Sequence, residues 1–104
     1  MLSEEKAQEA KVLKGMLEMV ITTMEKGYYQ DALGMCDVLL DFKEIRADGY
    51  YLKAECLRYL GRYKEAIENC DKVINDPALA SNPDLLLLVR SIKDDASEED
   101  RATS

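Results

Sequence analysis

The chain repeats itself at an offset of 34 residues, and this periodicity limits the possible folds more than any other feature. When residues 13–46 are aligned with residues 47–80, six positions are identical, whereas ordinary residue frequencies would give about two. The identical pairs are Gly15 with Gly49, Gly27 with Gly61, Tyr29 with Tyr63, Ala32 with Ala66, Cys36 with Cys70, and Asp37 with Asp71. A period of this length is typical of small structural units stacked in an array.

Each half of this repeated region has the pattern of a helical hairpin. A long segment with helical apolar periodicity leads to Gly27 or Gly61, and a tyrosine follows after one intervening residue. A second amphipathic segment comes next. Glycine readily adopts the left-handed backbone conformation that ends a helix in a tight turn. The pattern therefore predicts an all-α fold that contains two antiparallel helical hairpins.

The residue types and their spacing resemble the tetratricopeptide repeat (TPR) family, whose pattern runs Trp-x2-Leu-Gly-x2-Tyr, later Ala-x3-Phe, then Pro. In the second repeat (47–80) this pattern falls on Tyr50, Lys53, Ala54, Leu57, Ala66, Cys70 and Pro77. In the first repeat (13–46) it falls on Met16, Met19, Val20, Thr23, Ala32 and Cys36. The resemblance covers roughly two thirds of the chain. It implies hairpins stacked as a short TPR-like right-handed solenoid of about five helices.

Outside the repeats, the sequence predicts an early start for the first helix and one further helix at the end. Ser3 followed by acidic residues is a typical helix start, and the helix that it begins is expected to continue to Lys26. Asn82 and Pro83 begin a strongly apolar segment, which we interpret as a capping helix over 83–94. The acidic residues 96–104 are expected to form a disordered tail, so that 1–95 is the single folded domain.

Charge and hydropathy restrict the kinds of partner. Acidic residues outnumber basic ones, 21 to 14, and the net charge of −7 repels nucleic acid and anionic lipid. The longest aliphatic run, Leu85 to Val89, is far shorter than a membrane span, and the first residues do not have the pattern of a signal peptide. We therefore expect a soluble chain with neither nucleic-acid nor membrane partners.

Nothing in the sequence has the pattern of a catalytic, cofactor or metal site. The chain has no histidine, and its cysteines, Cys36, Cys56 and Cys70, lack metal-ligand spacing. Cys36 and Cys70 occupy equivalent repeat positions, a separation too large for a disulfide. We therefore interpret the three cysteines as reduced thiols in the core of a protein from a reducing, cytoplasmic compartment. Asp37 and Asp41 lie four residues apart but lack the spacing of a metal-binding loop. We therefore predict that the protein is not an enzyme.

The TPR resemblance also implies a partner-binding surface, because such proteins bind peptides along the concave face formed by the first helices of their repeats. Carried over position by position, that face consists of Leu17, Ile21, Met24, Tyr51, Glu55, Arg58 and Tyr59. A mostly apolar and aromatic surface of this kind suits a protein partner. Leu17, Ile21 and Leu52 occupy the positions of the family's carboxylate clamp, and aliphatic side chains cannot bind a carboxylate.

The leading hypothesis is a non-catalytic helical-repeat scaffold or protein–protein interaction module. An alternative is a homodimeric assembly module that uses the apolar concave face and the long first helix. The final helix is another candidate to cover the concave face. Two repeats completed by a long first helix and a capping helix are also what a designed scaffold would contain, and an artificial protein needs no ligand.

Overall fold

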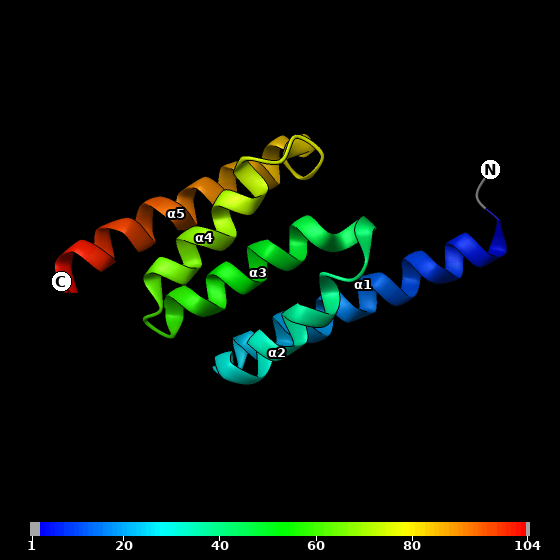
Figure 1. Cartoon of the computed structure of the whole chain (residues 1–104). Coiled ribbons are helices and arrows are strands. Elements are labelled where there is room, and N and C mark those ends of the chain that lie inside the picture. The colour runs from blue at the N-terminus through cyan, green and yellow to red at the C-terminus, as the bar shows by residue number, and fades with distance from the viewer. Residues whose placement is uncertain (1–2, 104) are drawn as a thin grey trace.

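A computed structural model describes residues 3–103, which form five α-helices and no β-strand (Figure 1). The helices are α1 (Glu4–Glu25), α2 (Tyr29–Leu39), α3 (Arg46–Tyr59), α4 (Tyr63–Ile74) and α5 (Pro83–Thr103), with the short 3-10 helices η1 (Lys43–Ile45) and η2 (Leu79–Ser81) between them. Each helix packs against the next one along the chain and runs in roughly the opposite direction. The prediction of an all-α fold with about five helices is confirmed.

The two turns at the predicted glycines have the same geometry. Gly27 and Gly61 have positive φ angles of 84° and 77°. After each glycine, the next backbone N–H donates to the carbonyl five residues earlier, at 3.2 Å beyond Gly27 and 2.8 Å beyond Gly61. This is the hydrogen-bonding pattern of a helix that closes on a left-handed residue. The predicted helical hairpins are therefore α1–α2 and α3–α4.

Polar side chains cap the two outer helices at their predicted starts. The Ser3 hydroxyl accepts a hydrogen bond from the Lys6 backbone N–H at 3.3 Å. The Asn82 side-chain oxygen accepts two bonds from backbone N–H groups in the first turn of α5, at 3.1 and 3.2 Å. Pro83, which lacks an N–H, begins α5 at a position where no partner is needed.

Helix α3 is the central element, because it packs against α2 and α4 and also contacts α1 and α5. Two apolar clusters meet on it. One joins α1 and α2 to α3 and also includes Ala66 of α4 and Ala96 of α5, and the other joins α3 to α4 and α5. Ala54 and Cys56 are fully buried on α3, and Leu57 is almost so. Small buried residues allow neighbouring helices to approach closely.

The capping helix is longer than predicted, and the prediction of a disordered tail is wrong for residues 96–103. Helix α5 continues to Thr103, and only Ser104 of that segment lies outside the described residues. Ala96 is fully buried and extends the buried stripe of α5, whose other members are Leu85, Val89 and Ile92. No proline or glycine interrupts the segment, so burial of this stripe continues the helix.

We expect Ala96→Asn to lower the free energy of unfolding by about 2 kcal/mol, because it places an amide in a fully buried apolar position. Ala102→Asn makes the same change at an exposed position of α5. It should cost no more than about 0.7 kcal/mol, the difference in helix propensity. Urea denaturation followed by circular dichroism measures both variants. Equal losses would contradict a packed C-terminal part of α5.

Gly49 marks the close approach of α3 to α2. A β-carbon at this position would lie 2.9 Å from Leu40 Cδ2 and 3.2 Å from Leu39 Cβ. We expect Gly49→Ala to lower the free energy of unfolding by about 1 kcal/mol or more, because overpacking outweighs the gain in helix propensity. In α2, a β-carbon at Gly34 would have no neighbour within 4 Å, so Gly34→Ala should stabilise the chain by about 0.5–1 kcal/mol. Paired urea melts test the difference in sign.

Candidate functional site

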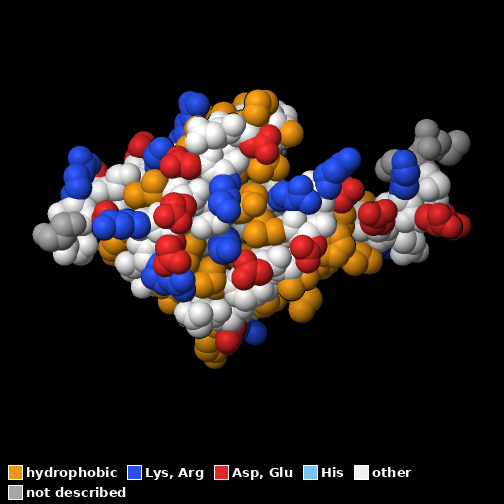
Figure 2. Space-filling model, viewed as in Figure 1, with side chains coloured by type: hydrophobic (Ala, Val, Ile, Leu, Met, Phe, Trp, Pro, Cys, Tyr) orange, Lys and Arg blue, Asp and Glu red, His pale blue; other side chains and the backbone are white. Residues whose placement is uncertain are grey.

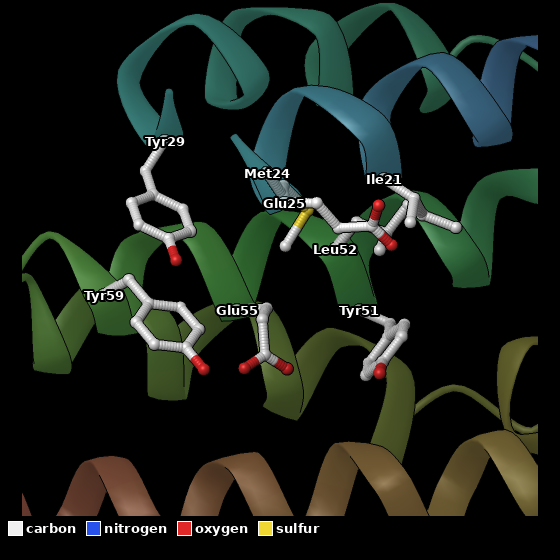
Figure 3. Close-up of a pocket in the computed structure, with 8 residues that line it drawn as sticks. All are labelled: Ile21, Met24, Glu25, Tyr29, Tyr51, Leu52, Glu55 and Tyr59. Carbon is white, nitrogen blue, oxygen red and sulfur yellow. The ribbon is translucent and has the colours of Figure 1, made fainter. Parts of the chain in front are cut away.

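An open pocket of about 400 Å³ lies between α1 and α3 (Figure 3). It is lined by Ile21, Met24 and Glu25 of α1, Tyr29 of α2, and Tyr51, Leu52, Glu55 and Tyr59 of α3. Because 3.6 residues make one helical turn, a spacing of four puts Tyr51, Glu55 and Tyr59 in one row along α3. The result is a shallow groove with apolar side chains from α1 on one side and this row on the other. We call it the α1–α3 groove.

Stacked aromatic rings form one end of the groove. The Tyr29 and Tyr59 rings are almost parallel, with an interplanar angle of 8° and centroids 4.7 Å apart (Figure 3). The Arg58 guanidinium lies 4.8 Å from the centroid of the Tyr59 ring. Stacking and cation–π contacts of this kind orient side chains that are partly exposed to water. Tyr59, although 54% exposed, is therefore held in place at the surface of the groove.

The charged groups that line the groove are carboxylates. Glu25 comes from α1 and Glu55 from α3, and no lysine or arginine is among the lining residues. Burial raises the pKa of Tyr51, and the negative charge of Glu55 raises it further. The Tyr51 phenol therefore stays protonated at neutral pH and can donate a hydrogen bond. The groove thus combines apolar surface, phenol groups and negative charge.

Arg58 connects the row on α3 to α5. Its Nη1 lies 2.6 Å from Glu99 Oε1 on α5, and its Nη2 lies 3.4 Å from Glu55 Oε1. Burial lowers the Arg58 pKa, but the hydrogen bond to Glu99 and the charges of Glu55 and Glu99 raise it above its ordinary value overall. Arg58 therefore remains charged and partly offsets the negative charge of Glu55.

The structure brings five of the seven predicted concave-face residues together in the groove: Ile21, Met24, Tyr51, Glu55 and Tyr59. Leu17 instead packs against the apolar cluster shared by α1, α2 and α3. Arg58 lies beside the groove, where it bonds to Glu99 and covers Tyr59.

Three lining residues were not predicted: Glu25, Tyr29 and Leu52. Glu25 occupies the repeat position equivalent to Tyr59, which the 34-residue offset shows. Leu52 was assigned only to the clamp positions, and Tyr29 only to the turn. The lining contains no residue of α5, so the final helix does not cover the groove in the described part of the chain.

The three cysteines are free and buried, as expected for core thiols. A hydrogen bond to Cys56 of α3, together with burial, raises the pKa of Cys36 of α2, and the same bond lowers the pKa of Cys56. Burial raises the pKa of Cys70 to about 12. The thiolate is the reactive form, so the raised pKa values suppress the nucleophilic reactivity of Cys36 and Cys70. Cys56 is protected by its burial, since its side chain is fully buried.

The acidic residues considered in the sequence do not gather into a cation site. Asp37 pairs with Lys53 of α3 at 2.8 Å, and Asp71 pairs with Lys93 of α5 at 2.6 Å. Over residues 3–103, no cluster of three or more histidine, cysteine or acidic side chains is arranged to hold a metal ion. Within the same residues, no helix is long and apolar enough to cross a membrane.

Comparison with models of known protein families, with curated proteins and with solved structures finds no match to this chain. The site must therefore be interpreted from its own geometry and chemistry.

We expect all three thiols of the native protein to react slowly with dithionitrobenzoate at pH 8. A pKa of about 12 leaves a thiolate fraction on the order of 10⁻⁴ at Cys70, and burial blocks access to each sulfur atom. Absorbance of the released thionitrobenzoate gives the rate, which should rise as the pH is raised toward 12. Unfolded protein in guanidinium is the control. A thiol that reacts equally fast in both states would contradict this packing.

Proposed function

We propose that this protein is a non-catalytic helical-repeat interaction module that binds a short peptide segment of a partner protein in the α1–α3 groove. The observation that carries the proposal is the groove itself, with its row of Tyr51, Glu55 and Tyr59. Tyrosine supplies large amphipathic contact area at low conformational cost and is enriched at protein interfaces.

The chemistry of the groove suggests the kind of peptide that fits it. Ile21, Met24 and Leu52 provide apolar surface for an aliphatic or aromatic side chain. Glu25 and Glu55 provide negative charge on the two sides of the groove, which favours a neighbouring lysine or arginine. The net charge of −7 attracts a basic segment from a distance. A peptide that alternates apolar and basic residues meets both requirements.

The repeat pattern supports the same proposal. Helices α1 and α3 contain equivalent residues of the two 34-residue units, and these are the helices that border the groove. In a TPR-like arrangement the first helices of successive units lie side by side and form the binding face. The groove therefore lies where the resemblance places a peptide.

An array of short random synthetic peptides, probed with labelled protein, tests the proposal. We expect enrichment of peptides in which lysine or arginine is adjacent to leucine or phenylalanine. For an enriched peptide, calorimetry should show about tenfold weaker binding by Tyr59→Ala, which removes an aromatic anchor of the groove. Glu55→Gln should weaken the binding of peptides that contain a basic residue and leave the binding of their uncharged analogues unchanged.

Glu68→Gln on α4 is the matched control, because it makes the same change at an exposed acidic residue that does not line the groove. It should bind the same peptides as the unaltered chain. An array on which Tyr59→Ala gives the same pattern as the unaltered protein would refute peptide binding in the groove.

A further inference from the structure

Helix α1 has a second, mostly apolar surface that the described part of the chain covers only in part, because Met16 packs against the core whereas Val12 and Met19 are exposed. Its members follow helical spacing along α1: Val12, Gly15, Met16, Met19 and Thr23. We call this surface the α1 outer stripe. Val12 is 60% exposed and Met19 is 63% exposed. Figure 2 shows hydrophobic side chains at the surface over the region of α1 and α2.

A mostly apolar recess of about 160 Å³ adjoins the α1 outer stripe. It is lined by Met16, Met19 and Val20 of α1 and by Met35, Val38 and Leu39 of α2. Methionine side chains are flexible and polarizable, which suits them to fill the gaps of a helix–helix contact. Val38, 51% exposed, extends the apolar surface onto α2.

The repeat indicates what kind of element belongs on this surface. Inside the protein, Gly49 of α3 lies against Leu39 and Leu40 at the end of α2. The position 34 residues earlier is Gly15, where an added β-carbon would have no neighbour within 4 Å. The α1 outer stripe is thus the repeat equivalent of a surface that receives a helix in the second unit. A helix is therefore the expected occupant.

The stripe is complementary to itself when a second copy of α1 runs antiparallel and crosses at Gly15 and Met16. In this register Val12 faces Met19 of the second copy, close to the recess. At the ends of the contact, Glu5 faces Lys26 of the second copy. An isologous interface requires that each such pair occur twice, and this register satisfies that condition. Gly15 lets the two helix backbones approach closely at the crossing point.

We propose that two copies of this chain associate through their α1 outer stripes as an antiparallel pair of helices. The contact covers Val12 and Met19 and forms two Glu5–Lys26 ion pairs. It also gives a neighbour to the N-terminal half of α1, where residues 4–12 are all exposed. The α1–α3 groove contains none of the stripe residues, so the association leaves the groove open.

The negative net charge opposes association of two copies, but only at long range. Each copy carries a charge of −7, whose repulsion is screened beyond roughly 8 Å at physiological ionic strength. Between Val12 and Thr23 the stripe itself has no charged residue. The contact is therefore apolar at its centre and attractive at both ends.

Sedimentation equilibrium in about 0.15 M salt with reductant tests the proposal. We expect a mass that rises with concentration toward twice 11.8 kDa. Met19→Glu should raise the dissociation constant at least about tenfold, because it places a carboxylate at the centre of an apolar contact. Leu87→Glu is the matched control, since Leu87 is 67% exposed on α5, and it should dimerise like the unaltered chain.

A charge exchange tests the antiparallel register. Lys26→Glu and Glu5→Lys should each weaken the dimer several-fold, and the chain with both changes should regain the original affinity. Lys64→Glu on α4 is the control for Lys26→Glu. It makes the same change in net charge at an exposed position away from the stripe and should leave the dimer intact.

Three results would overturn the proposal. The first is a constant mass of 11.8 kDa at all concentrations. The second is a dimer that Met19→Glu does not weaken, which would place the contact on another face. The third is a double charge exchange that fails to restore affinity, which would exclude this register. None of these results bears on the peptide array, so the two proposals fail or succeed independently.

Discussion

The packing of α3 between the two hairpins is the constraint on which the rest of this structure depends. Helix α3 contributes to both apolar clusters, and its buried positions carry small residues, among them Gly49, Ala54 and Cys56. Larger side chains there would push α2 and α4 away from α3. Because α3 also borders the groove, the same close packing that buries one side of α3 fixes Tyr51 and Tyr59 on the other.

Much of this fold could be predicted from the sequence, because its main signals are local. A glycine with positive φ ends α1 and α3, and polar caps begin α1 and α5, so the turns and helix starts follow from single residues. The end of α5 could not be predicted in this way. Its last turns are rich in charge, and their helical state depends on burial of Ala96 and on the distant Arg58–Glu99 pair. Composition alone does not reveal such non-local contacts.

The groove was predicted in outline for a similar reason. The first helices of the two hairpins, α1 and α3, lie side by side, which accounts for Ile21, Met24, Tyr51, Glu55 and Tyr59. The other groove residues could not be predicted, because the directions of long side chains do not follow from the repeat. Leu17 turns toward the core, whereas Tyr29 enters the groove from the start of α2 because its ring stacks on Tyr59. Periodicity predicts on which face of a helix a residue lies, but the neighbouring side chains determine in which direction a long side chain points.

The helices pack one against the next along the chain, and the first and last helices differ in the surface that they expose. At one end, α5 covers the apolar sides of α3 and α4, and its exposed residues include several acidic side chains as well as Leu87 and Leu88. At the other end, the surface of α1 that corresponds to the buried side of α3 remains apolar and carries a glycine at the point of closest approach. A capping surface would carry charge where Met19 and Val12 lie. This exposed apolar surface of α1 is the one for which we propose a second copy of α1 as the partner.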